Sequence, residues 1–216
     1  MFSYTKKYEM KPQLITGVPP QEKGSFHDTE SIRLAKDFED IVDLYKTLKH
    51  RLLSVNYWNY YASGVGADFK LHDKNGILKK RLPEKGDFIR IDIPGPGNFE
   101  ARGFDWVEIT DMYENLSAND EILEQLIIEC KPSGIPGKIN THTAHFYTGD
   151  ASSTFIVSRG KDFIKAGIYG RNETPNMDAQ IADKARNLAI ALGGMVGISK
   201  IQWKILTDGL VEFRSW

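Results

Sequence analysis

The sequence predicts an α+β protein in which a curved antiparallel sheet of about six to seven strands packs on a long C-terminal helix. Two observations lead to this prediction. Short segments of alternating apolar and polar residues are separated by turn-forming dipeptides, and one long segment near the C-terminus has helical periodicity. The connections are short, which favours antiparallel pairing, because parallel strands need long crossover connections.

The first 28 residues show no hydrophobic periodicity and include several Pro and Gly residues, so they are predicted to form an N-terminal arm ahead of a single domain, 29–216. The segment 31–35 is the predicted first strand. A helix is expected from about Asp37 to Leu53, because apolar residues recur there at +3 and +4 spacing, with Asp37 as its N-terminal cap.

The middle of the chain has the patterns of strands. The segments 67–71 and 77–81 flank Asn75-Gly76, a dipeptide that favours a two-residue hairpin turn. The segment 86–94 places Ile89, Ile91 and Ile93 on one face and ends at Pro94. Further strands are predicted at 104–109, 123–130, 143–147 and 153–158.

The stretch 163–196 is predicted to organise the fold as a strand, a polar corner at 171–176 and a long helix, Met177–Val196. The first half of this helix is amphipathic and the second half is apolar on every side. A short final helix is predicted from Ser199 to about Leu210. The order of these elements resembles the helix-grip architecture, in which a curved antiparallel sheet wraps a C-terminal helix.

Composition limits the function classes. The chain has 216 residues, 26% of them charged, and a formal net charge of −1, so no electrostatic surface for nucleic acid or an anionic membrane is predicted. The single cysteine, Cys130, excludes an internal disulfide, and no signal-like apolar segment opens the chain. We therefore expect a cytoplasmic protein without a cofactor.

The polar corner is the most suggestive candidate site, because free N–H groups at a helix N-terminus favour anions. Arg171, Asn172 and Glu173 are predicted to bind a ligand there, together with Arg159. The alternative is that Arg171 and Glu173 form an ion pair that only closes the helix end.

The other candidates are a histidine and aromatic residues. His142 and His145 are three residues apart on a predicted strand and point to opposite faces, so no metal site is predicted, although His145 stays a ligand-binding candidate. Trp106 is a candidate for lining a pocket. Cys130 is predicted to be a buried, unreactive thiol.

Three functions stay open from the residues alone. The first is a module that binds a small hydrophobic or acidic ligand in a cavity between the sheet and the long helix. The second is a structural or assembly protein that forms a homo-oligomer or binds a partner protein through the N-terminal arm, the aromatic segment Tyr57–Tyr61 and the end Phe213–Trp216. The third is a hydrolase or isomerase that uses His145, Glu173 and Arg171.

Overall fold

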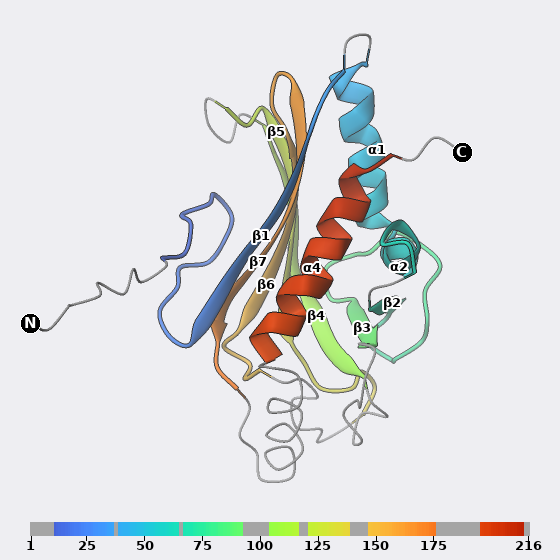
Figure 1. Cartoon of the computed structure of the whole chain (residues 1–216). Helices are drawn as coiled ribbons and strands as arrows, with labels where there is room; N and C mark the ends of the chain where they lie inside the picture. Colours follow the sequence, from blue (N-terminus) through green and yellow to red (C-terminus); the bar gives the residue numbers. More distant parts are fainter. Residues whose placement is uncertain are drawn as a thin grey trace, which may run out of the picture.

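The computed structural model describes residues 11–36, 39–64, 67–92, 104–116, 121–138, 147–175 and 195–213 (Figure 1). Seven strands form one antiparallel sheet in the order β1-β7-β6-β5-β4-β3-β2. The strands are β1 (Ser25–Leu34), β2 (Asp68–His72), β3 (Phe88–Asp92), β4 (Asp105–Leu116), β5 (Glu124–Pro132), β6 (Ser152–Arg159) and β7 (Phe163–Glu173). The predicted antiparallel sheet is confirmed.

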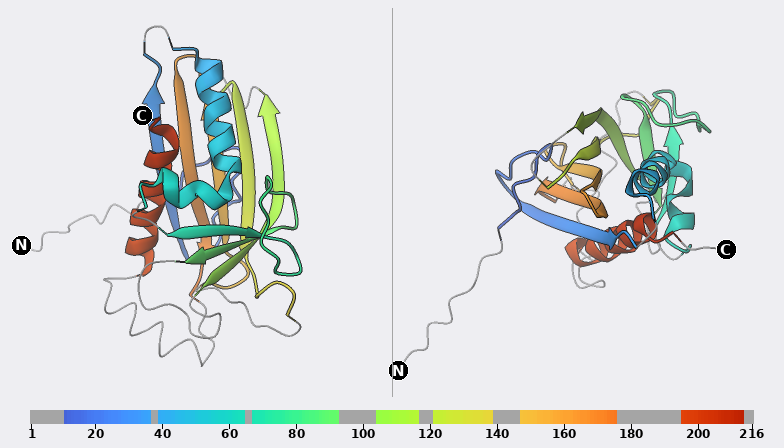
Figure 2. Two further views of the ribbon diagram at one scale, coloured as in Figure 1. Left: turned by 90° about the vertical axis from the view of Figure 1, so that its right-hand side faces the viewer. Right: turned by 90° about the horizontal axis from the view of Figure 1, so that it is seen from above.

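The described helices lie on one face of this sheet, which curves around them (Figure 2). They are α1 (Ile41–Leu53), the 3₁₀ turn η1 (Val55–Tyr57), α2 (Trp58–Tyr61) and α4 (Met195–Val211). A seven-stranded antiparallel sheet that holds a C-terminal helix fits the helix-grip fold. We call the helix-covered face the inner face and the opposite face the outer face.

Several predicted boundaries need correction. Helix α1 begins at Ile41, and its cap is Asp40, whose carboxylate accepts a hydrogen bond from the Val42 N–H at 2.8 Å. Asp37 lies outside the described residues. The segment 77–81 forms only an isolated bridge between His72 and Leu78 instead of a full strand. The turn before it holds the Asp73 carboxylate, which accepts the N–H of Asn75 at 2.9 Å and of Ile77 at 3.0 Å.

Strand β1 is longer than predicted and begins at Ser25, inside the predicted arm. Its alternating buried residues are His27, Thr29 and Ser31, so hydrophobic periodicity did not reveal it. Strand β4 also extends beyond its predicted end, to Leu116, past a bulge between Ile109 and Asp111.

The long helix predicted at Met177–Val196 lies outside the described residues except for its last two positions, which belong to α4. The final helix, predicted from Ser199, begins at Met195. The predicted strand 143–147 is described only at Tyr147, which bridges to Pro175.

The inner face carries the main core, in which aromatic rings fill the space between sheet and helices. Trp58 of α2 lies 5.1 Å from Phe69 and 5.0 Å from Phe155, measured between ring centroids. Trp203 of α4 lies 5.7 Å from Phe155. Cys130 belongs to the same core and is fully buried, and burial raises the pKa of its thiol, as expected for an unreactive cysteine.

The outer face has a smaller apolar cluster, covered by the lead-in, which we define as residues 11–24. Ile15 and Val18 of the lead-in pack against Ile127, Ile156 and Tyr169 of the sheet. The lead-in thus lies on the side of the sheet opposite the helices (Figure 1). Gly17 has a φ of 90° and sits so close to Ile127 that a side chain would collide.

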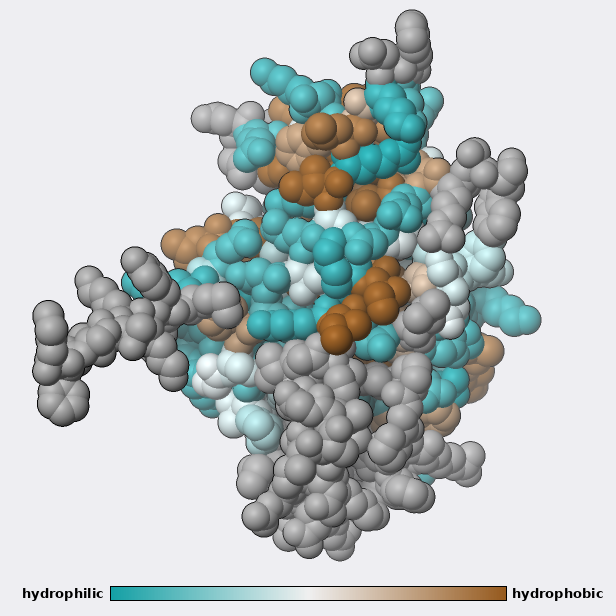
Figure 3. Space-filling view, viewed as in Figure 1, coloured by the Kyte–Doolittle hydropathy of each residue, from teal (hydrophilic) through white to brown (hydrophobic). Residues whose placement is uncertain are grey.

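Exposed apolar side chains gather at the end of the molecule where β1 finishes and α1 begins. They include Ile32 and Leu34 of β1 and Val42 of α1, and apolar surface is visible at that end in Figure 3. Among the described residues, no helix is long and apolar enough to cross a membrane.

Candidate functional site

A bulge at the end of β7 decides which side chains face the inner surface. Ser25 pairs with Glu173 and His27 pairs with Gly170, so the extra residue lies on β7. Asn172 takes it up with a φ of 57°. Side chains alternate normally up to Arg171, which therefore points to the outer face, whereas Glu173 beyond the bulge contacts His27 on the inner face.

The His27–Glu173 pair is buried on the inner face. His27 Nε2 lies 3.3 Å from Glu173 Oε1, and the side chains are 1% and 3% exposed. Gly170 lies beneath both, and a Cβ there would collide with the carboxylate and the imidazole. Ser25 Oγ donates to Glu173 Oε2 at 3.3 Å, and the carboxyl group is also hydrogen-bonded to the side chain of Tyr147.

Burial shifts both groups of the pair toward their neutral forms. Burial and the nearby charge of Lys200 lower the pKa of His27 to about 4, although Asp28 raises it. Burial raises the pKa of Glu173 to about 7, and hydrogen bonding to Ser25 and the charge of Lys200 oppose part of that shift. At neutral pH the imidazole is therefore neutral, and Glu173 is close to half protonated.

Helix α4 completes the site. The indole ring of Trp203 stacks on His27, with the centroids 6.4 Å apart and the planes 21° from parallel. Trp203 is partly exposed, whereas its neighbours Phe69 and Phe155 are buried. Trp203 therefore lies at the boundary of the apolar core, next to His27. Lys200 lies one helical turn before Trp203 on the same side of α4.

A second buried carboxyl group faces inward at the same end of the sheet. Asp105 pairs with Ile91, whose side chain belongs to the inner core. Among the described residues its Oδ1 atom has no hydrogen-bond partner, and burial raises the pKa of this carboxyl group well above its usual range. Burial therefore favours the neutral form of Asp105, which limits the negative charge at this end.

On the outer face, Arg171 is held entirely by the chain itself. Its guanidinium lies 2.6 Å from the carboxylate of Asp28 and donates to the carbonyls of Gly170 at 2.8 Å and Gln13 at 2.9 Å. The backbone N–H of Gln13 donates to the other oxygen of Asp28 at 2.8 Å. We call these residues the Arg171 cluster, and its geometry fits the scaffold alternative, with Asp28 as the partner instead of Glu173.

Asn172 fastens the lead-in to β7. Its side-chain oxygen accepts the N–H of Glu22 at 2.8 Å and of Lys23 at 3.2 Å, and its own N–H donates to the side chain of Gln21 at 2.9 Å. These contacts explain why a residue other than glycine is kept at positive φ. Asn172 therefore fixes the bulge that directs Glu173 inward.

The remaining candidates lie apart from one another. Arg159 pairs with Glu124, with Nε 2.8 Å from Oε1, and its register partner is Ile164, seven positions from Arg171 along β7. That separation is about 23 Å at the rise of a strand. Trp106 is on the outer face with Phe88, Phe104 and Ile135, and His145 lies outside the described residues.

Sequence reasoning missed His27, Lys200 and Trp203 as a group. The polar alternation of His27, Thr29 and Ser31 in β1 was the one available signal, because it is the pattern of a strand with a polar buried face. The contact between β1 and the end of β7 depends on the pairing of two strands that are far apart in the sequence, and local residue patterns do not predict such pairing.

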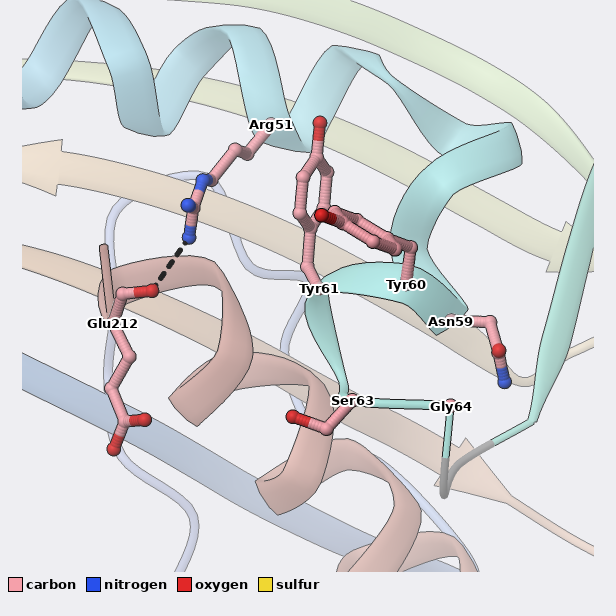
Figure 4. A pocket seen from close by; sticks show the side chains of 7 residues that line it. All are labelled: Arg51, Asn59, Tyr60, Tyr61, Ser63, Gly64 and Glu212. Atoms are coloured by element: carbon pink, nitrogen blue, oxygen red, sulfur yellow. Dashed lines mark hydrogen bonds between the residues drawn. The ribbon is translucent and has the colours of Figure 1, made fainter. Parts of the chain in front are cut away.

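A surface pocket of about 480 Å³ lies elsewhere, near the C-terminal end of α4 (Figure 4). Its lining residues are Arg51, Asn59, Tyr60, Tyr61, Ser63, Gly64 and Glu212. Arg51 Nη1 donates to the carbonyls of Gly209 at 2.9 Å and Glu212 at 2.8 Å, and the guanidinium lies 4.8 Å from the ring centroid of Tyr61. These bonds cap the end of α4, so we assign Arg51 a structural role.

The described residues contain no group of three or more His, Cys, Asp or Glu side chains placed to hold a metal ion.

No protein-family model matches the sequence, and no curated protein matches it. Solved structures are similar in shape. The major latex-like protein 151 from Panax ginseng has 11% identity and a TM-score of 0.37, with 87% of this chain and 97% of that chain covered. Norcoclaurine synthase from Thalictrum flavum, in complex with dopamine and hydroxybenzaldehyde, has 11% identity and a TM-score of 0.36, with 92% and 98% covered.

The di-domain protein StfQ from the steffimycin biosynthetic pathway has 11% identity and a TM-score of 0.38, with 86% of this chain and 50% of that chain covered. At these values the likeness carries no argument about function.

Proposed function

We propose that the protein binds a small molecule with a planar apolar body and one polar group, at the inner face beside Trp203. The observation that carries this proposal is the His27–Glu173 pair, two ionisable groups buried together at the edge of an aromatic core. Among the described residues, Nε2 of His27 has no hydrogen-bond partner within bonding geometry. Buried groups that lack full hydrogen bonding cost free energy, and proteins keep them most often at functional sites.

The chemistry of the walls supports this class of ligand. The partly exposed indole ring of Trp203, which packs on the buried rings of Phe69 and Phe155, offers apolar contact for a planar body, and the His27–Glu173 pair and Lys200 offer polar contact at one end. A single polar group matches this arrangement, because the rest of the described inner face is mostly apolar.

The homo-oligomer alternative receives less support from the lead-in. Residues 11–24 are docked on the outer face of their own sheet through the apolar cluster and the Asn172 contacts. A lead-in held in this way is not available to a partner unless those contacts break. The aromatic segment Tyr57–Tyr61 stays a candidate surface, with Tyr57 62% exposed.

Calorimetric titration with 2-naphthol tests the proposal. We expect binding to the intact protein, weakened about tenfold or more by Trp203→Ala, because a stacked aromatic contact contributes about 1–3 kcal/mol. Trp106→Phe on the outer face is the matched control and should leave the affinity unchanged. Loss of binding in the Trp106 variant, or no effect of Trp203→Ala, would exclude the inner-face site.

A further inference from the structure

Lys200 differs from the other lysine on the same side of α4. Lys204 Nζ donates to Asp208, four residues on, at 2.5 Å and to Ser31 of β1 at 2.9 Å. Lys200 is half-buried and makes no hydrogen bond or ion pair with a described residue, although its charge acts on both members of the His27–Glu173 pair. Among the described residues, no contact of its own compensates the charge of Lys200.

The position of Lys200 follows from the register between α4 and β1. Thr207 contacts Ser31, with their hydroxyl oxygens 2.8 Å apart, and Trp203, four residues earlier in α4, stacks on His27, four residues earlier on the same face of β1. Both contacts advance in the same order, so helix α4 and strand β1 run in the same direction, and the turn before Trp203 lies beside the start of β1 and the end of β7. Lys200 occupies that turn.

The groups that face the site can be counted by element. Strand β1 contributes His27, strand β7 contributes Glu173, and helix α4 contributes Lys200 and the engaged Lys204; Tyr147 bonds Glu173. Asp28 and Arg171 act from the outer face, where they neutralise each other. When Glu173 carries its proton, Lys200 supplies the net charge among the described groups of the site.

We propose that the polar group accepted by this site is a carboxylate, which Lys200 binds while the His27–Glu173 pair retains a proton and the ligand's apolar body lies on Trp203. The inference rests on the proposed function and names the class of ligand. A cationic ligand is disfavoured because it would meet Lys200. A neutral ligand would leave the ammonium group of Lys200 without a counter-charge in a half-buried position.

The inference also predicts a proton change. A bound carboxylate disfavours the ionised form of Glu173, whose pKa is already about 7. Binding at pH 7 should therefore take up about half a proton, whereas a neutral ligand should take up less. The acidic ligand class suggested by the sequence is retained, with Lys200 in the role that had been expected of Arg171.

The experiment compares three probes of one shape: 2-naphthoate, 2-naphthamide and 2-(aminomethyl)naphthalene, each titrated by calorimetry in phosphate and in Tris at pH 7. We expect 2-naphthoate to bind about tenfold more tightly than the amide, as a charge-assisted hydrogen bond contributes more than a neutral one. Lys200→Gln should reduce this preference to within about threefold, and Lys204→Gln, the matched control, should keep most of it.

The two buffers report proton uptake, because their ionisation enthalpies differ. Uptake with 2-naphthoate should disappear in Glu173→Gln. Equal affinity for the three probes, or tightest binding of the amine, would overturn the carboxylate while leaving the proposed function in place. Absence of binding by all three probes, and by 2-naphthol, would overturn both.

Discussion

The two faces of the sheet at the junction of β1 and β7 bury charged groups in opposite ways. On the outer face, the Arg171 guanidinium has a carboxylate and several carbonyls as partners, and the Asp28 carboxylate in turn accepts from Gln13. On the inner face, His27 and Glu173 lie 3.3 Å apart with their pKa values moved toward the neutral forms. The side chains of Arg171 and His27 are both 1% exposed, so burial alone does not distinguish the two faces.

The difference lies in how completely the partners compensate the cost of burial. A buried charge with full hydrogen bonding is a structural anchor, and removing one partner leaves the other uncompensated. A buried pair that is incompletely bonded is ready to exchange a proton or accept a ligand. We therefore assign structure to the outer cluster and function to the inner pair, although they share adjacent residues of the same two strands.

The largest expected effect comes from breaking the outer cluster. Arg171→Met leaves the Asp28 carboxylate buried without its counter-charge, so the free energy of unfolding should fall by about 3–5 kcal/mol. Urea denaturation at pH 7 measures it. Arg159→Met is the matched control and should cost about 1 kcal/mol or less, because its ion pair with Glu124 is partly exposed. An equal loss in the two variants would contradict the scaffold role of Arg171.

The second expected effect is on the pH dependence of stability, to which His27 and Glu173 contribute in opposite directions. Glu173, whose pKa is raised in the folded protein from 4.5 to about 7, removes stability as pH rises through that window. His27, whose pKa is lowered from 6.5 to about 4, adds stability as pH rises between 4 and 6.5. The two slopes oppose each other and largely cancel in the unaltered protein.

A variant of either residue should reveal how the other one makes the free energy of unfolding depend on pH. Relative to the unaltered protein, Glu173→Gln should gain about 3 kcal/mol between pH 4.5 and 7, and His27→Gln should lose about 3 kcal/mol between pH 4 and 6.5. Denaturation curves at half-unit pH steps measure both. His50→Gln, on exposed helix surface, is the control. Parallel curves for all four proteins would show that the pair is not perturbed.

The smallest effect tests the bulge. Asn172→Ala loses the side-chain bonds to the lead-in and places a Cβ at positive φ, so it should cost about 1–2 kcal/mol. Asn172→Gly loses the same bonds but tolerates the φ of 57°, and should cost less. If the pKa of Glu173 stays raised in the glycine variant, the backbone conformation at position 172 directs the carboxyl group inward. If the pKa shift is lost in both the alanine and the glycine variants, the side chain of Asn172 directs it.

Much of the fold was predictable, because strands with one apolar face leave a period of two. Ile89 and Ile91 are buried as their alternation indicates, and the chain turns at Asn75-Gly76, although three residues in place of the expected two lie between the bonded pair Asp73 and Ile77. Strand β1 was predicted only at 31–35, and its first half was missed because its buried residues are polar. The candidate site was harder still: Arg171 and Glu173 are two residues apart, and only the bulge at Asn172 places them on opposite faces.

The most direct test of the account is to observe where an apolar acid binds. Intermolecular nuclear Overhauser effects between 2-naphthoate and the labelled protein would locate it. The account predicts contacts from the naphthyl protons to the Trp203 indole and the His27 ring. Contacts to Tyr60 and Tyr61 in the surface pocket, or to Trp106 on the outer face, would contradict the assignment of function to the inner pair.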